Sequence, residues 1–211
     1  MGKNEGKDLT VWFDGRKCIH ARRCVLGQPD VFRADSRGKW IFPDSGDAEE
    51  VAAVVRSCPS GALRFEYTDG RGEARPPINV IRVTENGPLQ VRGDIEMGGK
   101  KAPIRAVLCR CGASKNKPFC DNRHRKIDFT ATGEVATADE VGELDDAAPL
   151  SVGAWKDGPL NVRGPVEIVA ASGRCVRRGG KFALCRCGQS SNKPYCDGTH
   201  NKVGFEAPES P

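Results

Sequence analysis

The chain has 211 residues, with 33 Lys and Arg against 28 Asp and Glu, so its formal net charge is +5. Aromatic residues make up 6% and hydrophobic residues 38%, whereas 25 glycines and 14 prolines supply material for turns. This thin supply of core residues favours several small modules stabilised by something other than one large core. The sequence has no stretch approaching the roughly 20 apolar residues needed to span a bilayer, so we expect no membrane contact.

Ten cysteines are the most informative part of the composition. The N-terminus shows no apolar run typical of a signal peptide, which favours a reducing compartment, and there cysteines bind metal more often than they form disulfides. We therefore expect a cytoplasmic metal-binding protein. The mild positive charge is either a solvated surface or a docking site for an acidic protein partner. Nucleic acid is not an expected partner, because no nucleic-acid motif is present and aromatic residues for base stacking are few.

The N-terminal part, 1–78, has the pattern of a small α+β unit. Short apolar runs between turn residues predict strands at 9–13, 39–42 and 62–65 and a short helical turn at 29–32. Asp47, with Glu50 three residues later, has the spacing of a capping box and predicts a helix that ends at Cys58. The stretch 71–77, rich in Arg, Gly and Pro, is the predicted hinge to the rest of the chain.

Three cysteines of this part form a recognisable set: Cys18-x5-Cys24, and later Cys58 followed by proline. Over about residues 8–68 the pattern resembles small single-cluster bacterial ferredoxins, except that Ala21 stands where their middle cysteine would be. The resemblance implies a [3Fe–4S] cluster on Cys18, Cys24 and Cys58. His20, beside the vacant position, could ligate a fourth iron and give a [4Fe–4S] cluster, or it could be a polar loop residue. A redox-inert or zinc-binding domain is the other alternative.

The remainder of the chain contains an internal repeat. A sixteen-residue segment occurs at 109–124 and again at 185–200, each time in the pattern C-x-C-x8-C-x3-H. The duplication extends to 87–93, which matches 158–164, and to 126–129, which matches 202–205. The flanking glycines Gly87 and Gly158 are 71 residues apart and the first cysteines of the motifs are 76 apart, so the second copy has about five extra residues, in 169–175. Runs at 89–91 and 106–108 predict strands, and the acidic stretch 130–146 predicts a linker.

Three thiolates and an imidazole in each copy form a complete ligand set for zinc or for an iron–sulfur cluster. Structural zinc sites usually space their first two cysteines as C-x2–4-C, whereas C-x-C is tighter. The spacing therefore favours a cluster and leaves zinc as the alternative.

The order Cys-x-Cys, then Ser, Pro and Cys-Asp-Gly-x-His resembles the CDGSH-type (mitoNEET-like) iron–sulfur domain, over 79–135 and 150–211. The resemblance implies a [2Fe–2S] cluster in each copy. In the first copy, one iron would be bound by Cys109 and Cys111 and the other by Cys120 and His124. In the second copy, one iron would be bound by Cys185 and Cys187 and the other by Cys196 and His200. Ser114 and Ser190 would donate hydroxyl hydrogen bonds to the cluster sulfurs, and Asp121 and Asp197 would accept backbone amides. The first copy has Asn122 where the family has Gly, and Asn tolerates the left-handed conformation that the turn requires.

Together these patterns predict an α+β protein with a ferredoxin-like domain at 1–78, a first β-rich CDGSH module at 79–140 and a second at 141–211. Because members of the CDGSH family work as dimers, the resemblance implies that the two modules form an intramolecular pseudo-dimer, so that the chain is a monomer. The three cysteine sets leave over only Cys175, which lies in the extra residues and is expected to be an inert thiol.

The predicted function is electron transfer by two [2Fe–2S] clusters and one [3Fe–4S] cluster, or [4Fe–4S] in the alternative, to a redox partner protein with an acidic surface. The sequence contains no glycine-rich nucleotide loop and no nucleophile–base arrangement, so we expect no catalytic residues and no enzymatic activity. Storage or delivery of iron–sulfur clusters is one alternative function. Metals that only stabilise small modules are the other.

Overall fold

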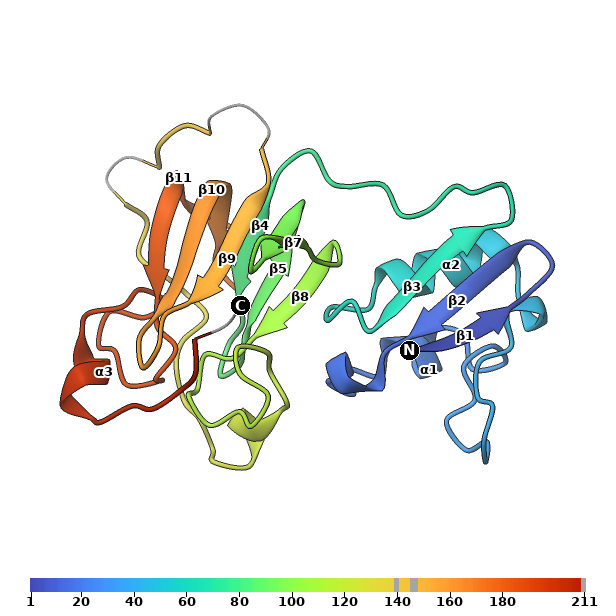
Figure 1. The fold of residues 1–211 in the computed structure, drawn as a ribbon, viewed down its shortest axis with the longest axis horizontal. Helices are drawn as coiled ribbons and strands as arrows, with labels where there is room; N and C mark the ends of the chain where they lie inside the picture. Colours follow the sequence, from blue (N-terminus) through green and yellow to red (C-terminus); the bar gives the residue numbers. More distant parts are fainter. Residues whose placement is uncertain (139–140, 145–147, 210–211) are drawn as a thin grey trace. The chain divides into compact units, whose positions relative to one another are not determined.

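The computed structural model describes residues 1–138, 141–144 and 148–209. The chain folds into two compact units, Met1–Ala74 and Arg75–Pro211 (Figure 1). Both are built mainly of strands, with few and short helices, so the fold is of the mixed α+β kind. Among the described residues no helix combines the length and the apolar character needed to cross a bilayer.

The first unit contains a three-stranded antiparallel sheet in the order β1-β2-β3. The strands span Gly2–Glu5, Leu9–Phe13 and Leu63–Tyr67. Buried and exposed residues alternate along β3, as expected for a strand with one face on a core. Helix α2 (Ala48–Arg56) packs against β3 and buries its apolar stripe of Val51, Ala52 and Val55.

The start of α2 follows from its sequence. The Asp47 carboxylate accepts the backbone amides of Glu49, at 3.0 Å, and Glu50, at 3.1 Å, which satisfies two of the amides that a helix start leaves without partners. The Glu50 side chain accepts from the Gln28 amide, at 2.9 Å, so the predicted capping pair contributes its first half only. The helix ends two residues before Cys58, which confirms the predicted helix.

One prediction for the first unit needs correction, and one element was not predicted. The expected strand at 39–42 is reduced to one isolated bridge between Phe32 and Ile41, and of its four residues only Ile41 is fully buried. The expected helical turn at 29–32 is present as a single turn, in which the amides of Val31 and Phe32 donate to the Gln28 carbonyl, whereas the short helix α1 (Arg23–Gly27) was not predicted. Helix α1 could not be predicted from the sequence because its N-cap residue, Arg22, makes no capping side-chain hydrogen bond. Two 3₁₀ turns, η1 (Gly15–Lys17) and η2 (Pro43–Ser45), complete the unit.

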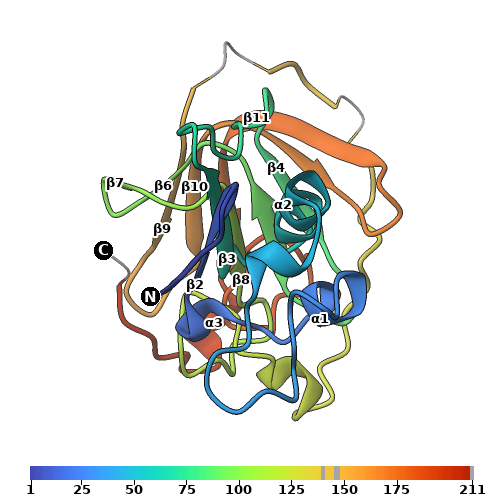
Figure 2. The ribbon, with the colours of Figure 1, turned by 90° about the vertical axis from the view of Figure 1, so that its right-hand side faces the viewer.

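The second unit is one eight-stranded sheet in the order β7-β6-β9-β10-β4-β5-β8, with β11 paired to β10. The strands of the first repeat are β4 (Val80–Val83), β5 (Leu89–Arg92), β6 (Ile95–Met97), β7 (Lys100–Lys101) and β8 (Arg105–Leu108). Those of the second are β9 (Leu150–Ala154), β10 (Leu160–Val169) and β11 (Cys175–Leu184). The predicted strands at 89–91 and 106–108 are thus confirmed, as parts of β5 and β8. The long hairpin of β10 and β11 is drawn in orange in Figures 1 and 2.

The strands of the two repeats exchange partners reciprocally. Strand β4 pairs in parallel with the end of β10, with Val80 opposite Glu167. Strand β9 pairs in parallel with β6, with Ser151 opposite Glu96. These are equivalent contacts, because the 71-residue offset between Gly87 and Gly158 also relates Val80 to Ser151 and Glu96 to Glu167. Each repeat therefore completes the sheet of the other.

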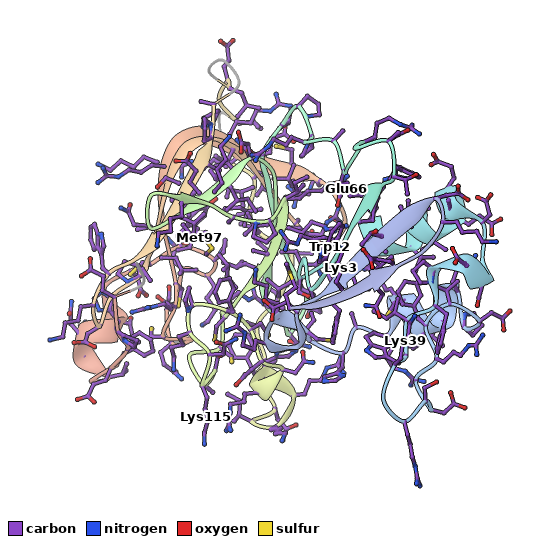
Figure 3. The ribbon with its side chains drawn as sticks, turned by 45° about the vertical axis from the view of Figure 1, so that its right-hand side comes forward. Lys3, Trp12, Lys39, Glu66, Met97 and Lys115 are labelled. Carbon is purple, nitrogen blue, oxygen red and sulfur yellow. The ribbon has the colours of Figure 1, made fainter. Side chains whose placement is uncertain are left out.

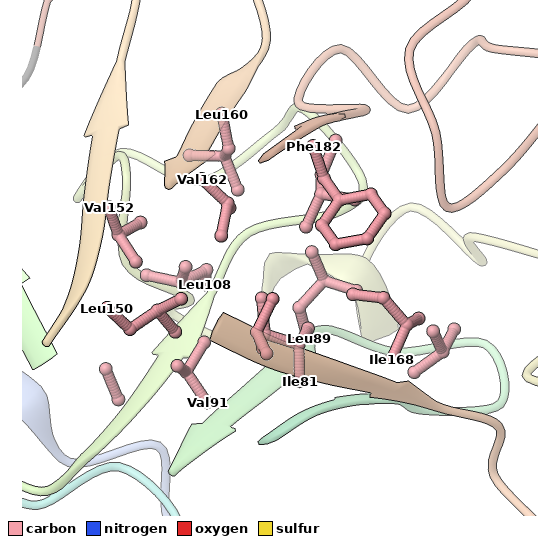
Figure 4. Packing of buried hydrophobic residues seen from close by; sticks show 14 of the residues in the cluster. Ile81, Leu89, Val91, Leu108, Leu150, Val152, Leu160, Val162, Ile168 and Phe182 are labelled. Atoms are coloured by element: carbon pink, nitrogen blue, oxygen red, sulfur yellow. The ribbon is translucent and has the colours of Figure 1, made fainter. Parts of the chain in front are cut away.

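One hydrophobic core lies beneath this sheet and draws on both repeats (Figure 4). The first repeat contributes Ile81, Leu89, Val91 and Leu108, and the second contributes Leu150, Val152, Leu160, Val162, Ile168 and Phe182. Burying such a side chain stabilises a fold by about 1.5–3 kcal/mol relative to leaving it exposed. The core is therefore a shared source of stability, and neither repeat has a separate one among the described residues.

The five extra residues of the second repeat lengthen a hairpin. They form the turn between β10 and β11, closed by a 2.9 Å hydrogen bond from the Ala170 amide to the Arg174 carbonyl. Cys175 is the first residue of β11, where a loop was expected. The predicted linker, 130–146, has no helix or strand at 130–138 and 141–144, and its other residues lie outside the described part. The domain boundaries at 78/79 and 140/141 stay predictions.

Candidate metal centres

The two repeated motifs begin where strands end. Strand β8 leads directly into Cys109, and β11 leads directly into Cys185, at the same end of the sheet (Figure 1). The chain then returns antiparallel to the same strand, so the Cys120 amide donates to the Val107 carbonyl and the Cys196 amide to the Ala183 carbonyl, both at 2.9 Å. This return brings the third cysteine of each motif next to the first two.

The ligand atoms come together as pairs. The sulfurs of Cys109 and Cys111 lie 3.8 Å apart, as do those of Cys185 and Cys187. In the first motif, the Cys120 sulfur lies 3.5 Å from Nδ1 of His124. Across the described residues, no three His, Cys, Asp or Glu side chains form a group around a single ion position.

The histidine of the second motif is oriented differently. Nδ1 of His200 lies 2.9 Å from the backbone carbonyl oxygen of Asp157. Ligating imidazoles commonly donate their second ring N–H to such a carbonyl, which fixes the ring and leaves the other nitrogen for the metal. The second motif is also more open: His124 and Cys120 are only 8% and 5% exposed, whereas His200 and Cys196 are half-buried.

Backbone amides surround the sulfurs. The amides of Asn122, Gln189 and Gly198 lie 3.3, 3.4 and 3.5 Å from the sulfurs of Cys120, Cys187 and Cys196, respectively. The amides of Ser114 and Ser190 likewise bond to the first cysteine of their motifs. Such N–H donors stabilise a sulfur that carries negative charge, as a thiolate ligand does.

For three of these thiols, Cys109, Cys120 and Cys185, the surroundings disfavour ionisation in the absence of a metal. Burial raises the pKa of the Cys120 thiol to about 11 and also raises that of Cys185. A hydrogen bond with Cys111, together with burial, raises the pKa of Cys109. Burial lowers the pKa of His124, which favours the neutral ring that can act as a ligand. Soft sulfur donors with one neutral imidazole, enclosed away from water, suit iron–sulfur or zinc binding.

The motif serines have a different hydrogen-bond partner from the predicted one. The Ser114 hydroxyl donates to the Phe119 carbonyl, at 2.6 Å, and the Ser190 hydroxyl donates to the Tyr195 carbonyl, at 2.7 Å. Each hydroxyl also accepts the backbone amide two residues later. The serine side chains thus shape the ligand loop, and a direct bond to cluster sulfur stays a prediction.

The motif aspartates act on the backbone as predicted. Asp121 accepts the amides of Lys115 and Arg123, at 2.9 and 3.1 Å, and Asp197 accepts the equivalent pair in the second motif, at 2.8 and 3.0 Å. Hydrogen bonds from Thr199 hold the pKa of Asp197 well below its usual range. The residue after each aspartate is left-handed, with φ of +66° at Asn122 and +82° at Gly198, so the turn survives the Gly-to-Asn difference.

The two C-x-C loops lie against each other. A Cβ on Gly112 would overlap the carbonyl oxygen of Cys187, and a Cβ on Gly188 would lie 2.5 Å from the carbonyl oxygen of Cys111. Both glycines are also left-handed, with φ near +80°. Only glycine fits at either position, and its small size brings the two metal sites next to each other within one core.

Sequence reasoning missed the arginine between the first two cysteines of each motif. Arg110 and Arg186 are each only 1% exposed, although a charged side chain is rarely buried so fully. A signal was available, because the same charged residue stands between two ligands in both motifs.

The three cysteines of the first unit line one cavity of about 540 Å³. Cys18 follows the η1 turn, Cys24 lies in α1 and Cys58 follows α2, so three separate elements position them. Burial raises the pKa of Cys18 and Cys24. His20 and Ala21, at the position of the absent fourth cysteine, line the same cavity.

The chain bends sharply around this vacant position. His20 and Arg22 have positive φ angles of +50° and +63°, which are uncommon for residues other than glycine. The His20 amide donates to the Cys18 sulfur at 3.4 Å, while the His20 side chain is exposed. The structure thus brings the predicted cysteines to one cavity that is large enough for a small cluster.

Comparison with known proteins finds family matches in both units. The family model described as iron-binding zinc finger, CDGSH type, matches 86–125 and 157–201, and the one described as a divergent 4Fe-4S mono-cluster matches 4–68. The uncharacterized protein YjdI of Escherichia coli K12 is 37% identical over 62 residues, which are 29% of this chain and 80% of YjdI.

Two relatives are ferredoxins by name. Ferredoxin soy of Streptomyces griseus is 37% identical over 60 residues, covering 26% of this chain and 92% of that protein. Ferredoxin fas2 of Rhodococcoides fascians is 33% identical over 69 residues, covering 31% of this chain and 23% of that protein. No solved structure matches the chain. The chain therefore belongs to the CDGSH-type iron-binding family through two tandem motifs, preceded by a divergent 4Fe-4S mono-cluster domain, and it is an iron–sulfur protein.

Proposed function

We propose that this iron–sulfur protein is an electron carrier rather than an enzyme, with three cluster sites in one chain. The observation that carries the proposal is the direct contact of the two C-x-C loops, which brings two sites together inside one core. Electrons exchange fastest between centres that are close and shielded from water, and a shared rigid core provides both conditions. Two ferredoxins among the relatives support the same function.

The second unit would hold two [2Fe–2S] clusters. In each motif the C-x-C pair would bind one iron, and the third cysteine with the histidine would bind the other. The pairing of the donor atoms, at 3.8 Å for each C-x-C pair and 3.5 Å for Cys120 with His124, supports this arrangement over a single zinc ion. Such a cluster accepts one electron when bound. The protein residues keep water away, orient the ligands and donate amide hydrogen bonds to the sulfurs.

The first unit would hold a [3Fe–4S] cluster on Cys18, Cys24 and Cys58. The alternative is a [4Fe–4S] cluster, with His20 or an outside ligand at the position of Ala21. We favour the three-iron form because three cysteines line the cavity, whereas the side chain of His20, which also lines it, is exposed.

The reciprocal strand pairing supports an intramolecular pseudo-dimer, so we propose that the chain acts as a monomer.

The redox partner of the chain would be an acidic protein that docks beside the first motif. Four cations, Lys115, Arg123, Arg125 and Lys126, surround that motif, whereas the equivalent positions of the second motif hold only one, Lys202. Figure 3 shows Lys115 pointing away from the ribbon. Such positive charge attracts an acidic surface and favours reduction of the nearby cluster. The reduced ligand thiols suit a cytoplasmic location.

Storage or delivery of clusters is a second candidate, and one observation favours it. Cys196 and His200, the third cysteine and the histidine of the second motif, are half-buried, so solvent can reach them. A delivery protein would transfer this cluster to an apo-acceptor faster than it exchanges electrons with a redox partner.

Iron, sulfide and zinc analysis with electron paramagnetic resonance, before and after dithionite, tests the proposal. We expect about seven irons per chain, which is the sum of one three-iron and two two-iron clusters. An oxidised sample should give the signal of the three-iron cluster, and reduction should produce a new signal. About eight irons would indicate a fourth ligand at the N-terminal site. Zinc with little sulfide would contradict the electron-carrier function.

A further inference from the structure

Arg110 and Arg186 are the least expected feature of the second unit. Each guanidinium donates to four backbone carbonyls. The acceptors of Arg110 are Gly87 at 2.9 Å, Thr132 at 3.0 Å, and Thr84 and Ala131 at 2.8 Å; those of Arg186 are Gly158 at 2.9 Å, Pro208 at 3.0 Å, Trp155 at 2.6 Å and Ala207 at 3.4 Å. The two arginines thus use equivalent acceptors, each within its own repeat. This network fixes both guanidinium groups.

Carbonyl dipoles satisfy the hydrogen bonds of a buried guanidinium but do not neutralise its charge. A fully buried charge is costly unless negative charge lies nearby. Arg110 interacts electrostatically with Glu85 of its own repeat and with Cys185 of the other repeat. Arg186 interacts in the same way with Asp157 of its own repeat and with Cys109 of the other. In both cases the cysteine that interacts with the arginine belongs to the opposite motif.

The contact of the two C-x-C loops explains this exchange. Because Gly112 lies on the Cys187 carbonyl and Gly188 on the Cys111 carbonyl, each loop runs directly across the other. The two C-x-C segments therefore lie side by side, close enough for Arg110 to interact electrostatically with Cys185 and for Arg186 to interact with Cys109. The arrangement is reciprocal, as is the strand pairing beneath it.

We propose that Arg110 and Arg186 are cross-repeat positioning residues. Each arginine is fixed by carbonyls of its own repeat and supplies the buried positive charge beside the metal site of the other repeat. The retention of metal in each motif, and the reduction potential there, then depend on the arginine of the opposite motif. The part that concerns potential rests on the proposed electron-carrier function.

The direction of the effect follows from charge. A site with three thiolates becomes more negative on reduction, and a fixed cation beside it favours that change. Removing the arginine of one repeat should therefore lower the reduction potential in the other repeat. It should also weaken retention of metal there, because the thiolates lose a compensating charge.

Single-site proteins separate the two effects. Cys120→Ser with His124→Ala empties the first motif, and Cys196→Ser with His200→Ala empties the second, while both C-x-C loops stay intact. Arg110→Gln and Arg186→Gln are then made in each full-length background. When only the second motif is loaded, Arg110 is the cross-repeat residue and Arg186 is the control. When only the first is loaded, the roles reverse.

The readouts are the midpoint potential of the remaining cluster, its iron and sulfide content, and thermal unfolding of the metal-free protein. We expect the cross-repeat variant to make reduction of the remaining cluster about tenfold less favourable, which is a shift of about 59 mV for a one-electron couple. The own-repeat variant should shift the midpoint potential by at most about a third of that amount. A change of potential that is equal or larger in the own-repeat variant would overturn the proposal. A purely structural role would lower thermal unfolding without this asymmetry.

Lysine variants carry the same test if the glutamine variants do not fold. Lysine places its charge differently from a guanidinium, so each lysine variant should also change the midpoint potential. A larger change at the cluster of the opposite motif than at that of its own motif supports the proposal, and an equal or smaller change overturns it. If the parent protein holds zinc without sulfide, the electron-carrier function fails independently. The cross-repeat assignment is then decided by whether Arg110→Gln reduces zinc content more at the second motif than at the first.

Discussion

At the scale of single residues, the two motifs differ most in the turn before the histidine. Asn122 and Gly198 adopt the same left-handed conformation, and the asparagine carries the steric cost of a Cβ there. The turn positions His124 in one motif and His200 in the other, and it also supplies an amide to the third cysteine sulfur. The position therefore contributes to the stability of the ligand loop.

A pair of substitutions at this position isolates the backbone effect. Asn122→Ala should lower the free energy of unfolding of the second unit by about 1 kcal/mol relative to Asn122→Gly, since both remove the amide side chain and only alanine keeps the Cβ. Urea denaturation of the metal-free protein followed by circular dichroism measures the difference. Lys126, which has φ of −84° nearby, is the control, because there the glycine variant should be the less stable. Equal stability of the two Asn122 variants would contradict the expected strain.

At the scale of elements, helix α2 shows how local sequence positions a ligand. Its N-cap fixes where the helix begins, its apolar stripe fixes which face meets the sheet, and its end delivers Cys58 to the cavity. The same element was predictable because cap and stripe are both local. Helix α1, which carries Cys24, has no capping side chain and was not predictable.

Loss of the cap should weaken the first unit in a defined way. Asp47→Ala should lower its free energy of unfolding by about 1 kcal/mol, because two helix amides lose their acceptor. Asp47→Asn should keep most of the stability, since its amide oxygen can also accept. Fluorescence of Trp12 and Trp40 in a urea series reports the unfolding. Asp35→Ala, at another exposed position, is the control, and an equal loss there would refute the capping role.

At the scale of the whole second unit, neither repeat forms a separate structure. Each first strand pairs with the other repeat, one core serves both, and the ligand loops share a backbone contact. Damage to one loop should therefore reach both metal sites.

Gly112→Ala tests this dependence. The added Cβ overlaps the Cys187 carbonyl, so we expect iron to fall by more than the first motif alone can hold. Gly99→Ala is the matched control, because Gly99 is also left-handed but has open space around its Cβ position, and it should cost only about 1 kcal/mol. Iron analysis of the purified variants decides the matter. Iron loss confined to the first motif would show that the two sites are independent.

The sequence by itself indicated the candidate ligands and determined the local turns around them. These features depend on residues only a few positions apart, so they can be recognised from the sequence: the cysteine spacing, the repeated motif, the aspartate that holds each turn and the cap of α2. Tertiary structure alone decided the exchange of strands between repeats, the greater exposure of Cys196 and His200, and the burial of Arg110 and Arg186. These depend on contacts between segments that are distant in the chain, and local sequence carries no signal for which of two similar repeats a strand will join.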